Sequence, residues 1–103
     1  MKYRIEFTQT GKEMLSQDIS DVRIKKQILK RIERLDTDPE KQGEPLVGEL
    51  SGFRKIRVAK KRFRIIYKID RNSRTVYIFA VGIRKEGNKS DVYHKAKKLL
   101  GLI

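Results

Sequence analysis

The spacing of hydrophobic residues changes along the chain, and each change predicts a different element. In 2–7 (KYRIEF) and 53–58 (FRKIRV), apolar and charged residues alternate, which is typical of strands with one buried face. A third strand is predicted over 63–69. Residues 75–83 (TVYIFAVGI) are apolar at both parities, which predicts a central strand covered on both faces. Short turns join the last three strands into a predicted antiparallel meander, with the first strand in the same sheet.

Two helices are predicted between the first strand and the meander. Thr10 and Glu13 have the spacing of a capping box, which predicts a short helix that continues through Leu15. Ser20 or Asp21 is expected to cap a second helix of roughly four turns. Its apolar positions recur at helical spacing, with one leucine beside the stripe: Ile24, Ile28, Ile32, Leu35 and Leu29.

A third predicted helix lies near the end of the chain, and Ser90 or Asp91 is expected to cap it. Its inward stripe is Val92, Ala96 and Leu99. The predicted order is therefore β-α-α-β-β-β-α, an α+β fold that forms a single domain over 1–103. We expect the N-terminal helical hairpin to pack on one face of the antiparallel sheet, opposite a basic and partly open sheet face.

Composition adds a strong positive charge to this picture. The 103 residues include 26 Lys and Arg but only 13 Asp and Glu, a formal net charge of +13. Residues 1–52 contain ten basic and ten acidic residues, so the whole excess lies in 53–103, with sixteen basic and three acidic residues. The predicted partner is therefore a polyanion that binds the meander and the last helix.

The same composition excludes several classes of protein and site. No run of about 18 apolar residues is present, which argues against a membrane span, and the charged N-terminal segment lacks the apolar core of a signal peptide. With no cysteine and one histidine, disulfides and Cys or His metal clusters are excluded, and no cofactor is expected. We expect a protein of the reducing cytoplasm, without a membrane partner.

The strongest candidate site is a group of four cations on the meander. Lys55 and Arg57 are two residues apart on one predicted strand, so their side chains point to the same face. Arg64 lies on the neighbouring strand, and Arg84 ends the strand after it. Since neighbouring strands are about 4.8 Å apart, the four cations could surround one phosphate. The alternative is a solvated charged face, although like charges on adjacent strands repel unless an anionic ligand offsets them.

A tyrosine and a histidine stand near the start of the last predicted helix. Tyr93 lies off the apolar stripe, where it fits either a helix edge or a role in base stacking or proton transfer beside the cations. His94 is interpreted as a solvated surface residue or a catalytic one. The side chains expected to bind RNA around this centre are Lys60, Lys61, Arg62, Lys85, His94, Lys95, Lys97 and Lys98.

The residue types near the cations limit the chemistry. Only Glu86 and Asp91 among the acidic residues lie near the cluster, and no phosphate-binding glycine loop or nucleophile elbow is present, which disfavours two-carboxylate and two-metal mechanisms. Cations and a tyrosine are sufficient for metal-independent RNA cleavage. In that reaction a base takes the proton of a ribose 2′-OH, the oxygen attacks the adjacent phosphate, and an acid protonates the leaving 5′ oxygen.

A set of short sequence words runs through the second half of the chain. They are Leu50–Gly52, Phe53–Val58, Phe63–Tyr67, Val76–Ile78, Ala80–Arg84 and Asp91–Tyr93. Together they resemble the bacterial and archaeal RelE/ParE toxin superfamily of type II toxin–antitoxin pairs. The N-terminal strand and helical hairpin also suit that family, so the resemblance covers nearly the whole chain.

The resemblance implies a microbial-RNase-like fold and an endoribonuclease, an mRNA interferase that cuts mRNA on the ribosome and inhibits translation. Its implied partners are mRNA, 16S rRNA and a cognate acidic antitoxin with an amphipathic C-terminal segment. RelE-type members use basic residues on two meander strands, an arginine after the last strand and a tyrosine on the last helix. The matching positions, implied to be catalytic, are Lys55, Arg57, Arg64, Arg84 and Tyr93.

Two departures from the RelE pattern affect the implied roles. Position 57 is arginine where lysine is familiar, and arginine is a poor general base because it stays protonated. The base is therefore expected to be Lys55 or Tyr93. The segment between Arg84 and Tyr93 is also longer than in compact RelE members, which affects where Tyr93 is placed.

Two other functions fit parts of the sequence. A ParE-like toxin would use the same fold to inhibit DNA gyrase, but that branch generally lacks the full set of cations and tyrosine. A non-catalytic RNA-binding module is the second alternative, because double-stranded-RNA-binding domains have a related α-β-β-β-α order and a Lys-rich start to the last helix. Such a module leaves the extra N-terminal strand and helix unexplained.

Overall fold

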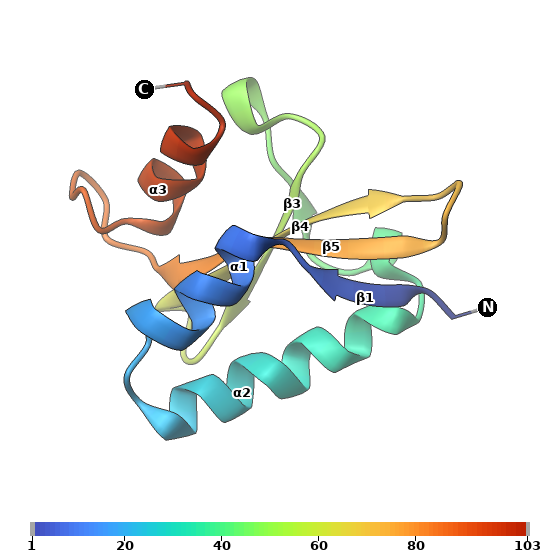
Figure 1. Ribbon diagram of the computed structural model, residues 1–103, viewed down its shortest axis with the longest axis horizontal. Coiled ribbons are helices and arrows are strands. Elements are labelled where there is room, and N and C mark those ends of the chain that lie inside the picture. Colours follow the sequence, from blue (N-terminus) through green and yellow to red (C-terminus); the bar gives the residue numbers. More distant parts are fainter. Residues whose placement is uncertain (1, 103) are drawn as a thin grey trace.

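The computed structural model describes residues 2–102 and is built around one five-stranded sheet. The strands are β1 (Arg4–Phe7), β2 (Glu44–Pro45), β3 (Arg54–Val58), β4 (Phe63–Asp70) and β5 (Thr75–Ile83). Their order across the sheet is β1-β5-β4-β3-β2. The meander β3-β4-β5 is antiparallel and β1 joins β5 in parallel, as Figure 1 shows. The α+β class and the four predicted strands are confirmed.

The short strand β2 was absent from the predicted elements. Glu44 pairs with Lys55 and Pro45 with Arg54 at the edge of the sheet. Prolines and a glycine in this stretch are typical of a loop, and a proline is tolerated in a sheet only at such an edge.

Buried hydrogen bonds hold the loop before β2 against the meander. The Tyr67 hydroxyl donates to the carbonyl oxygens of Pro39 at 3.0 Å and Gln42 at 2.6 Å. Burial raises the pKa of this phenol, although the hydrogen bond and charge of Arg54 oppose the rise. Tyr67 is fully buried, so its hydroxyl is a structural group and not an exposed one.

Helix α2 (Val22–Glu33) covers one face of the sheet. Asp21 caps it, since its carboxylate accepts hydrogen bonds from the backbone N–H groups of Arg23 and Ile24. The predicted inward stripe is confirmed for Ile28, Ile32 and Leu35, which pack on apolar residues of β3, β4 and β5. The helix has 12 residues, fewer than four turns, because a 3-10 turn begins at Arg34.

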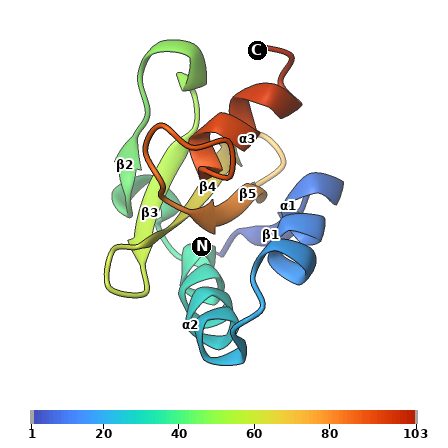
Figure 2. The ribbon, with the colours of Figure 1, turned by 90° about the vertical axis from the view of Figure 1, so that its left-hand side faces the viewer.

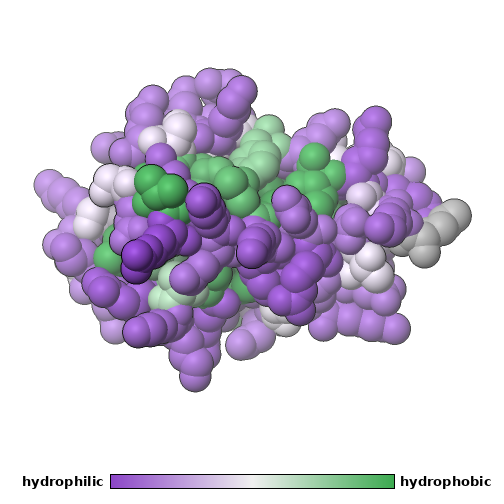
Figure 3. Space-filling view, turned by 90° about the horizontal axis from the view of Figure 1, so that it is seen from below, coloured by the Kyte–Doolittle hydropathy of each residue, from purple (hydrophilic) through white to green (hydrophobic). Residues whose placement is uncertain are grey.

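The outer surface beside α2 is mostly charged, with a narrow apolar band. Figure 3 views the molecule from below and shows hydrophilic side chains interrupted by hydrophobic ones. Leu29, predicted beside the inward stripe, is 41% exposed and lines a shallow groove with Phe7 and Leu15. Helical periodicity places Leu29 at the margin of the buried face, which explains this exposure.

Helix α1 (Gln9–Glu13) lies along the edge of β5 where β1 ends. Its cap is Thr8 and not the predicted Thr10, because the Thr8 hydroxyl accepts from Gly11 N–H and also reaches the Ile78 carbonyl oxygen. The capping box therefore predicted the helix start two residues too late. Thr8 is the cap because its hydroxyl bonds both to the helix and to the backbone of β5. Gly11 faces the β5 backbone, and a Cβ atom there would lie 2.3 Å from the Ile78 oxygen.

Substitution Gly11→Ala is therefore expected to push α1 away from β5. We expect the free energy of unfolding to fall by about 1–3 kcal/mol, the usual cost of overpacking a fitted contact. Urea denaturation of Gly11→Ala, with Gln9→Ala in the same helix as control, measures this. A Gly11→Ala protein as stable as the control would contradict the close approach.

Helix α3 (Val92–Leu99) covers the end of the opposite sheet face. Val92 and Ala96 are buried there against Ile66 and Ala80, with Met14 from the π-helical turn after α1. Leu99, predicted in the same stripe, is 45% exposed because it lies in the last turn, beyond that cluster. Figure 2 shows α2 and α3 on opposite sides of the sheet.

Candidate functional site

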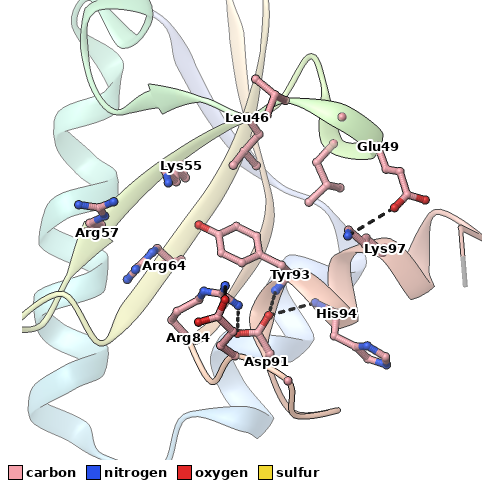
Figure 4. Close-up of a pocket in the computed structure, with 15 residues that line it drawn as sticks. Leu46, Glu49, Lys55, Arg57, Arg64, Arg84, Asp91, Tyr93, His94 and Lys97 are labelled. Carbon is pink, nitrogen blue, oxygen red and sulfur yellow. Dashed lines mark hydrogen bonds and ion pairs between the residues drawn. The ribbon is translucent and has the colours of Figure 1, made fainter.

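A groove of about 880 Å³ lies on the α3 face of the sheet. Strands β3 and β4 form one wall, α3 forms the other, and the segment 46–50 before β3 closes one end (Figure 4). All five side chains implied to be catalytic line this groove: Lys55, Arg57, Arg64, Arg84 and Tyr93. The structure therefore brings the predicted cation group and the tyrosine together.

Strand register explains why the cations meet. Arg57 pairs with Arg64 across β3 and β4, and Lys55 pairs with Ile66. Paired residues of neighbouring strands point to the same face, so the three cations share the face on which α3 packs. The irregularity in the β4–β5 register falls between Ile66 and Tyr67, after Arg64, and leaves this arrangement intact.

Positive charge on the strand side of the groove has no acidic counterpart. Within residues 2–102, no carboxylate lies within 4.0 Å of Lys55, Arg57 or Arg64 in an ion pair. Like charges at paired strand positions destabilise a sheet. The groove therefore carries an unbalanced charge that an anion would neutralise.

Arg64 is partly bound by the turn that joins β3 to β4. Its Nη1 donates to the carbonyl oxygen of Lys61 at 2.6 Å, while its buried Nε has no hydrogen-bond partner in the described part of the chain. The turn contains three consecutive left-handed residues, with φ values of 54° at Ala59, 57° at Lys60 and 66° at Lys61. The hydrogen bond from Arg64 stabilises the last of them. An unpaired buried donor is costly, so an acceptor that reached the Arg64 Nε would stabilise the side chain.

Tyr93 enters the groove from the first turn of α3. Figure 4 shows its hydroxyl pointing toward the strand cations. That oxygen is buried, and nothing in residues 2–102 forms a hydrogen bond with it. The guanidinium carbon of Arg84 lies 4.8 Å from the centre of the Tyr93 ring, a cation–π contact that supports the ring from one side.

Arg84 differs from the other cations because acidic side chains already hold it. Its Nη1 donates to the Asp91 carboxylate at 2.8 Å, and its Nη2 lies 3.6 Å from Glu86. The hydrogen bond from Arg84 to Asp91 raises the pKa of Arg84, although burial opposes the rise. The two carboxylates therefore fix the position of the Arg84 guanidinium beside Tyr93 and neutralise its charge.

Asp91 is a site residue whose full role the sequence did not reveal. The residue is 3% exposed, and it caps α3 as well as binding Arg84. Burial by itself would raise the pKa of Asp91, but hydrogen bonds from Arg84 and from the Lys85 N–H, with the charge of Arg84, hold that pKa below its usual value. Capping preference predicted the helix start, but no short-range pattern indicated the bond to Arg84.

The lowered pKa of Asp91 predicts a loss of stability in acid. A group whose pKa is lower in the folded state contributes stability above its unfolded pKa, near 3.9, and loses it as pH falls through the folded pKa. Near pH 7 we expect Asp91→Asn to lower the free energy of unfolding by about 1.5–3 kcal/mol, the range for hydrogen bonds to charged groups. Urea denaturation from pH 7 to pH 2 should show this difference shrinking below about pH 4. A constant difference would contradict the assignment.

A family model of the ParE toxin of the type II toxin–antitoxin system parDE matches residues 8–87. The chain belongs to this toxin family. The predicted membership of the RelE/ParE superfamily is therefore confirmed. No curated protein matches the chain significantly in sequence.

Solved structures of similar toxins share the fold. The RelBE2 toxin–antitoxin complex from Mycobacterium tuberculosis matches with 28% identity and a TM-score of 0.69, covering 82% of this chain and 93% of that chain. A mutant of Escherichia coli RelE in the free state has 19% identity and a TM-score of 0.73, covering 97% and 99%. The YoeB/ParE toxin from Agrobacterium tumefaciens has 16% identity and a TM-score of 0.67, covering 80% and 99%.

The remaining predicted RNA-binding side chains of the toxin are spread over several parts of the structure. His94 and Lys97 line the groove, although Figure 4 shows the His94 ring pointing away from the strand cations and Lys97 paired with Glu49 at 3.4 Å. Lys95 lies beside α1, where it binds Asp18 at 2.7 Å. The others lie at the β3–β4 turn, beyond β5 and on α3: Lys60, Lys61, Arg62, Lys85 and Lys98.

Residues 2–102 contain neither a candidate metal centre nor a candidate membrane-spanning helix. No set of three or more His, Cys, Asp or Glu side chains in this range is placed to hold a metal ion. No helix within it has the length and hydrophobicity needed to cross a bilayer.

Proposed function

We propose that the toxin is a ribosome-dependent, metal-independent endoribonuclease that cuts mRNA and so inhibits translation. One observation carries the proposal: a groove with three cations that lack acidic partners also holds the buried, unpartnered hydroxyl of Tyr93. Unbalanced cations fit a phosphate, and an unpartnered hydroxyl beside them fits proton transfer.

The reaction that suits these groups is transfer of a phosphate ester within the RNA chain. The ribose 2′-oxygen loses its proton and attacks the adjacent phosphorus, and the bond to the 5′ oxygen breaks, which leaves a 2′,3′-cyclic phosphate and a free 5′-OH. Arg57 and Arg64 would hold the phosphoryl oxygens and stabilise their charge. Lys55 and Tyr93 would divide the two proton transfers, one accepting from the 2′-OH and the other donating to the 5′ oxygen.

The ribosome and an antitoxin are the proposed partners of this toxin. The cations outside the groove would attach it to 16S rRNA and mRNA, a contact that weakens with added salt. Similar toxins have been solved in complex with antitoxins, including RelBE complexes from Mycobacterium tuberculosis and Escherichia coli. A cognate acidic antitoxin is therefore the proposed neutralising partner, and it would compete for the same positive charge.

Inhibition of DNA gyrase is the second candidate function, and the match to the ParE family model favours it. The site favours the nuclease, because inhibition of gyrase requires no tyrosine hydroxyl in a groove lined by cations. The two proposals predict different products in cells. One yields broken mRNA, and the other yields damaged or incorrectly supercoiled DNA.

Controlled expression of the toxin in bacteria tests the nuclease proposal. We expect growth arrest within minutes, with new mRNA 5′ ends inside translated reading frames and with DNA supercoiling unchanged. The same cleavage should appear with purified toxin only when ribosomes carry the mRNA. Intact mRNA together with inhibited gyrase would establish the ParE-like alternative. Tight, salt-sensitive binding to naked duplex RNA without any cleavage would establish a non-catalytic RNA-binding module.

A further inference from the structure

Both carboxylate oxygens of Asp91 accept hydrogen bonds, and the two oxygens bind different parts of the structure. Oδ1 accepts from Arg84 Nη1 at 2.8 Å and from the Lys85 N–H at 2.6 Å. Oδ2 accepts from the N–H groups of Tyr93 at 3.0 Å and His94 at 3.3 Å. One side of the carboxylate therefore holds the arginine after β5, and the other side starts α3.

Arg84 depends on Asp91 for its place over Tyr93. Its other acidic partner, Glu86, has a side chain that is 89% exposed and lies 3.6 Å away, a surface pair that contributes little. The bond to Asp91 is shorter and largely buried, with the Asp91 side chain 5% exposed. The guanidinium that Asp91 holds is the one that lies 4.8 Å from the centre of the Tyr93 ring.

We propose that Asp91 is a positioning residue, which sets the Tyr93 hydroxyl in the groove by holding Arg84 against the tyrosine ring. The proposal rests on the proposed nuclease function for its kinetic consequence, while its geometric part concerns the free protein. Asp91 positions Tyr93 in two ways. It fixes the backbone at the start of α3, where Tyr93 lies, and it holds the Arg84 guanidinium that packs on the Tyr93 ring. Asp91 and Arg84 touch neither the 2′-OH nor the phosphate in this scheme.

The chemistry of the side chain separates this role from simple helix capping. Asparagine is as good an N-cap as aspartate, so a residue that only capped α3 would tolerate Asp91→Asn. A carboxylate accepts hydrogen bonds at both oxygens, whereas an amide accepts at its oxygen and donates at its nitrogen. An asparagine at position 91 can satisfy the two N–H groups of α3 or the Arg84 side, but not both.

The matched control is Asp21, which caps α2 in the same way. Its Oδ1 accepts from the N–H groups of Arg23 and Ile24, and no arginine side chain is bound to it. Asp21→Asn should therefore leave the toxin unchanged in every measurement. Any effect of Asp91→Asn beyond that of Asp21→Asn belongs to the second role.

The first test uses free protein and needs no activity. NMR signals of the Tyr93 ring and of the Arg84 guanidinium are compared in the natural protein, Asp91→Asn and Asp21→Asn. We expect Asp91→Asn to shift the Tyr93 ring signals and speed exchange of the Arg84 Nη protons, one of which Asp91 now binds, while circular dichroism shows that α3 remains. Unchanged Tyr93 and Arg84 signals in Asp91→Asn would overturn the proposal even if the toxin proved not to cut RNA.

The second test measures cleavage of mRNA on ribosomes. We expect Asp91→Asn to lower kcat about 10-fold with KM nearly unchanged, as expected for a misplaced catalytic group. In an Arg84→Ala background, Asp91→Asn should have no further effect, because the guanidinium it positions is gone. Independent, multiplying losses, or a natural kcat in Asp91→Asn, would overturn the positioning role. Failure of every variant to cut RNA would refute the proposed function instead.

Discussion

Tyr93→Phe is expected to slow mRNA cleavage by about 100- to 10,000-fold, the range for loss of a general acid or base. The same substitution should leave the free energy of unfolding unchanged or slightly higher, because the Tyr93 hydroxyl is buried without a partner. Few substitutions in a small protein combine a large loss of rate with no loss of stability. This combination distinguishes a catalytic hydroxyl from a structural one.

Tyr67→Phe provides the matched control, because it removes a buried tyrosine hydroxyl that lies outside the groove, on β4. Tyr67 donates to the carbonyl oxygens of Pro39 and Gln42, so its loss should lower the free energy of unfolding by about 1–3 kcal/mol. The rate of cleavage should stay close to that of the natural protein. Single-turnover cleavage and urea denaturation of both variants provide the four measurements. A Tyr93→Phe protein that cuts at the natural rate would remove Tyr93 from the mechanism.

Much of the sheet could be predicted because its strands carry their periodicity in the sequence. Alternation in 53–58 placed Ile56 on the core side and Lys55 with Arg57 on the other, and the structure has them so. The continuous apolar run 75–83 indicated a central strand, and β5 indeed lies between β1 and β4. These properties depend on residues close together in the chain, where hydrophobic spacing is informative.

Elements that depend on distant partners were harder to predict. Thr8 replaced Thr10 as the cap of α1 because its hydroxyl also reaches the backbone of β5, a contact across 70 residues. Strand β2 forms because Glu44 pairs with Lys55 of β3 at the edge of the sheet. Its proline is typical of a loop when only the neighbouring residues are considered. Helical spacing assigned Leu99 to the core, although the apolar cluster under α3 ends before it.

The candidate site shows the same contrast between features set by neighbouring residues and features set by distant ones. Strand parity predicted that Lys55 and Arg57 share a face, because parity is a local property, whereas the place of Arg64 on that face follows from the β3–β4 register. Parity could not show that Arg84 is neutralised by Asp91, since that pair depends on how the 85–91 loop folds back. The four cations looked equivalent in the sequence, but the structure divides them into two kinds. Within residues 2–102, the three strand cations have no acidic partner, whereas Arg84 binds Asp91 and packs on the Tyr93 ring.

This division predicts that loss of a single strand cation removes most of the activity. We expect Arg64→Ala to lower kcat for mRNA cleavage by about 100- to 1,000-fold, the usual cost of removing one group that stabilises transition-state charge. Within residues 2–102 Arg64 has no acidic partner and its Nε has no acceptor, so no described carboxylate neutralises its charge in the free protein. The carbonyl oxygen of Lys61 that it now binds is exposed, and water can replace the guanidinium there.

Arg71→Ala is the control for charge alone. Arg71 is exposed in the turn between β4 and β5 and does not line the groove, so both variants lose one positive charge. If long-range attraction to RNA were all that Arg64 provided, both variants would raise KM slightly and show the same salt dependence. A local role predicts a loss of kcat in Arg64→Ala alone, with growth arrest relieved in proportion. Full toxicity of an Arg64→Ala, Arg84→Ala double variant would refute the nuclease mechanism, because no arginine would then remain on β4 or at the end of β5.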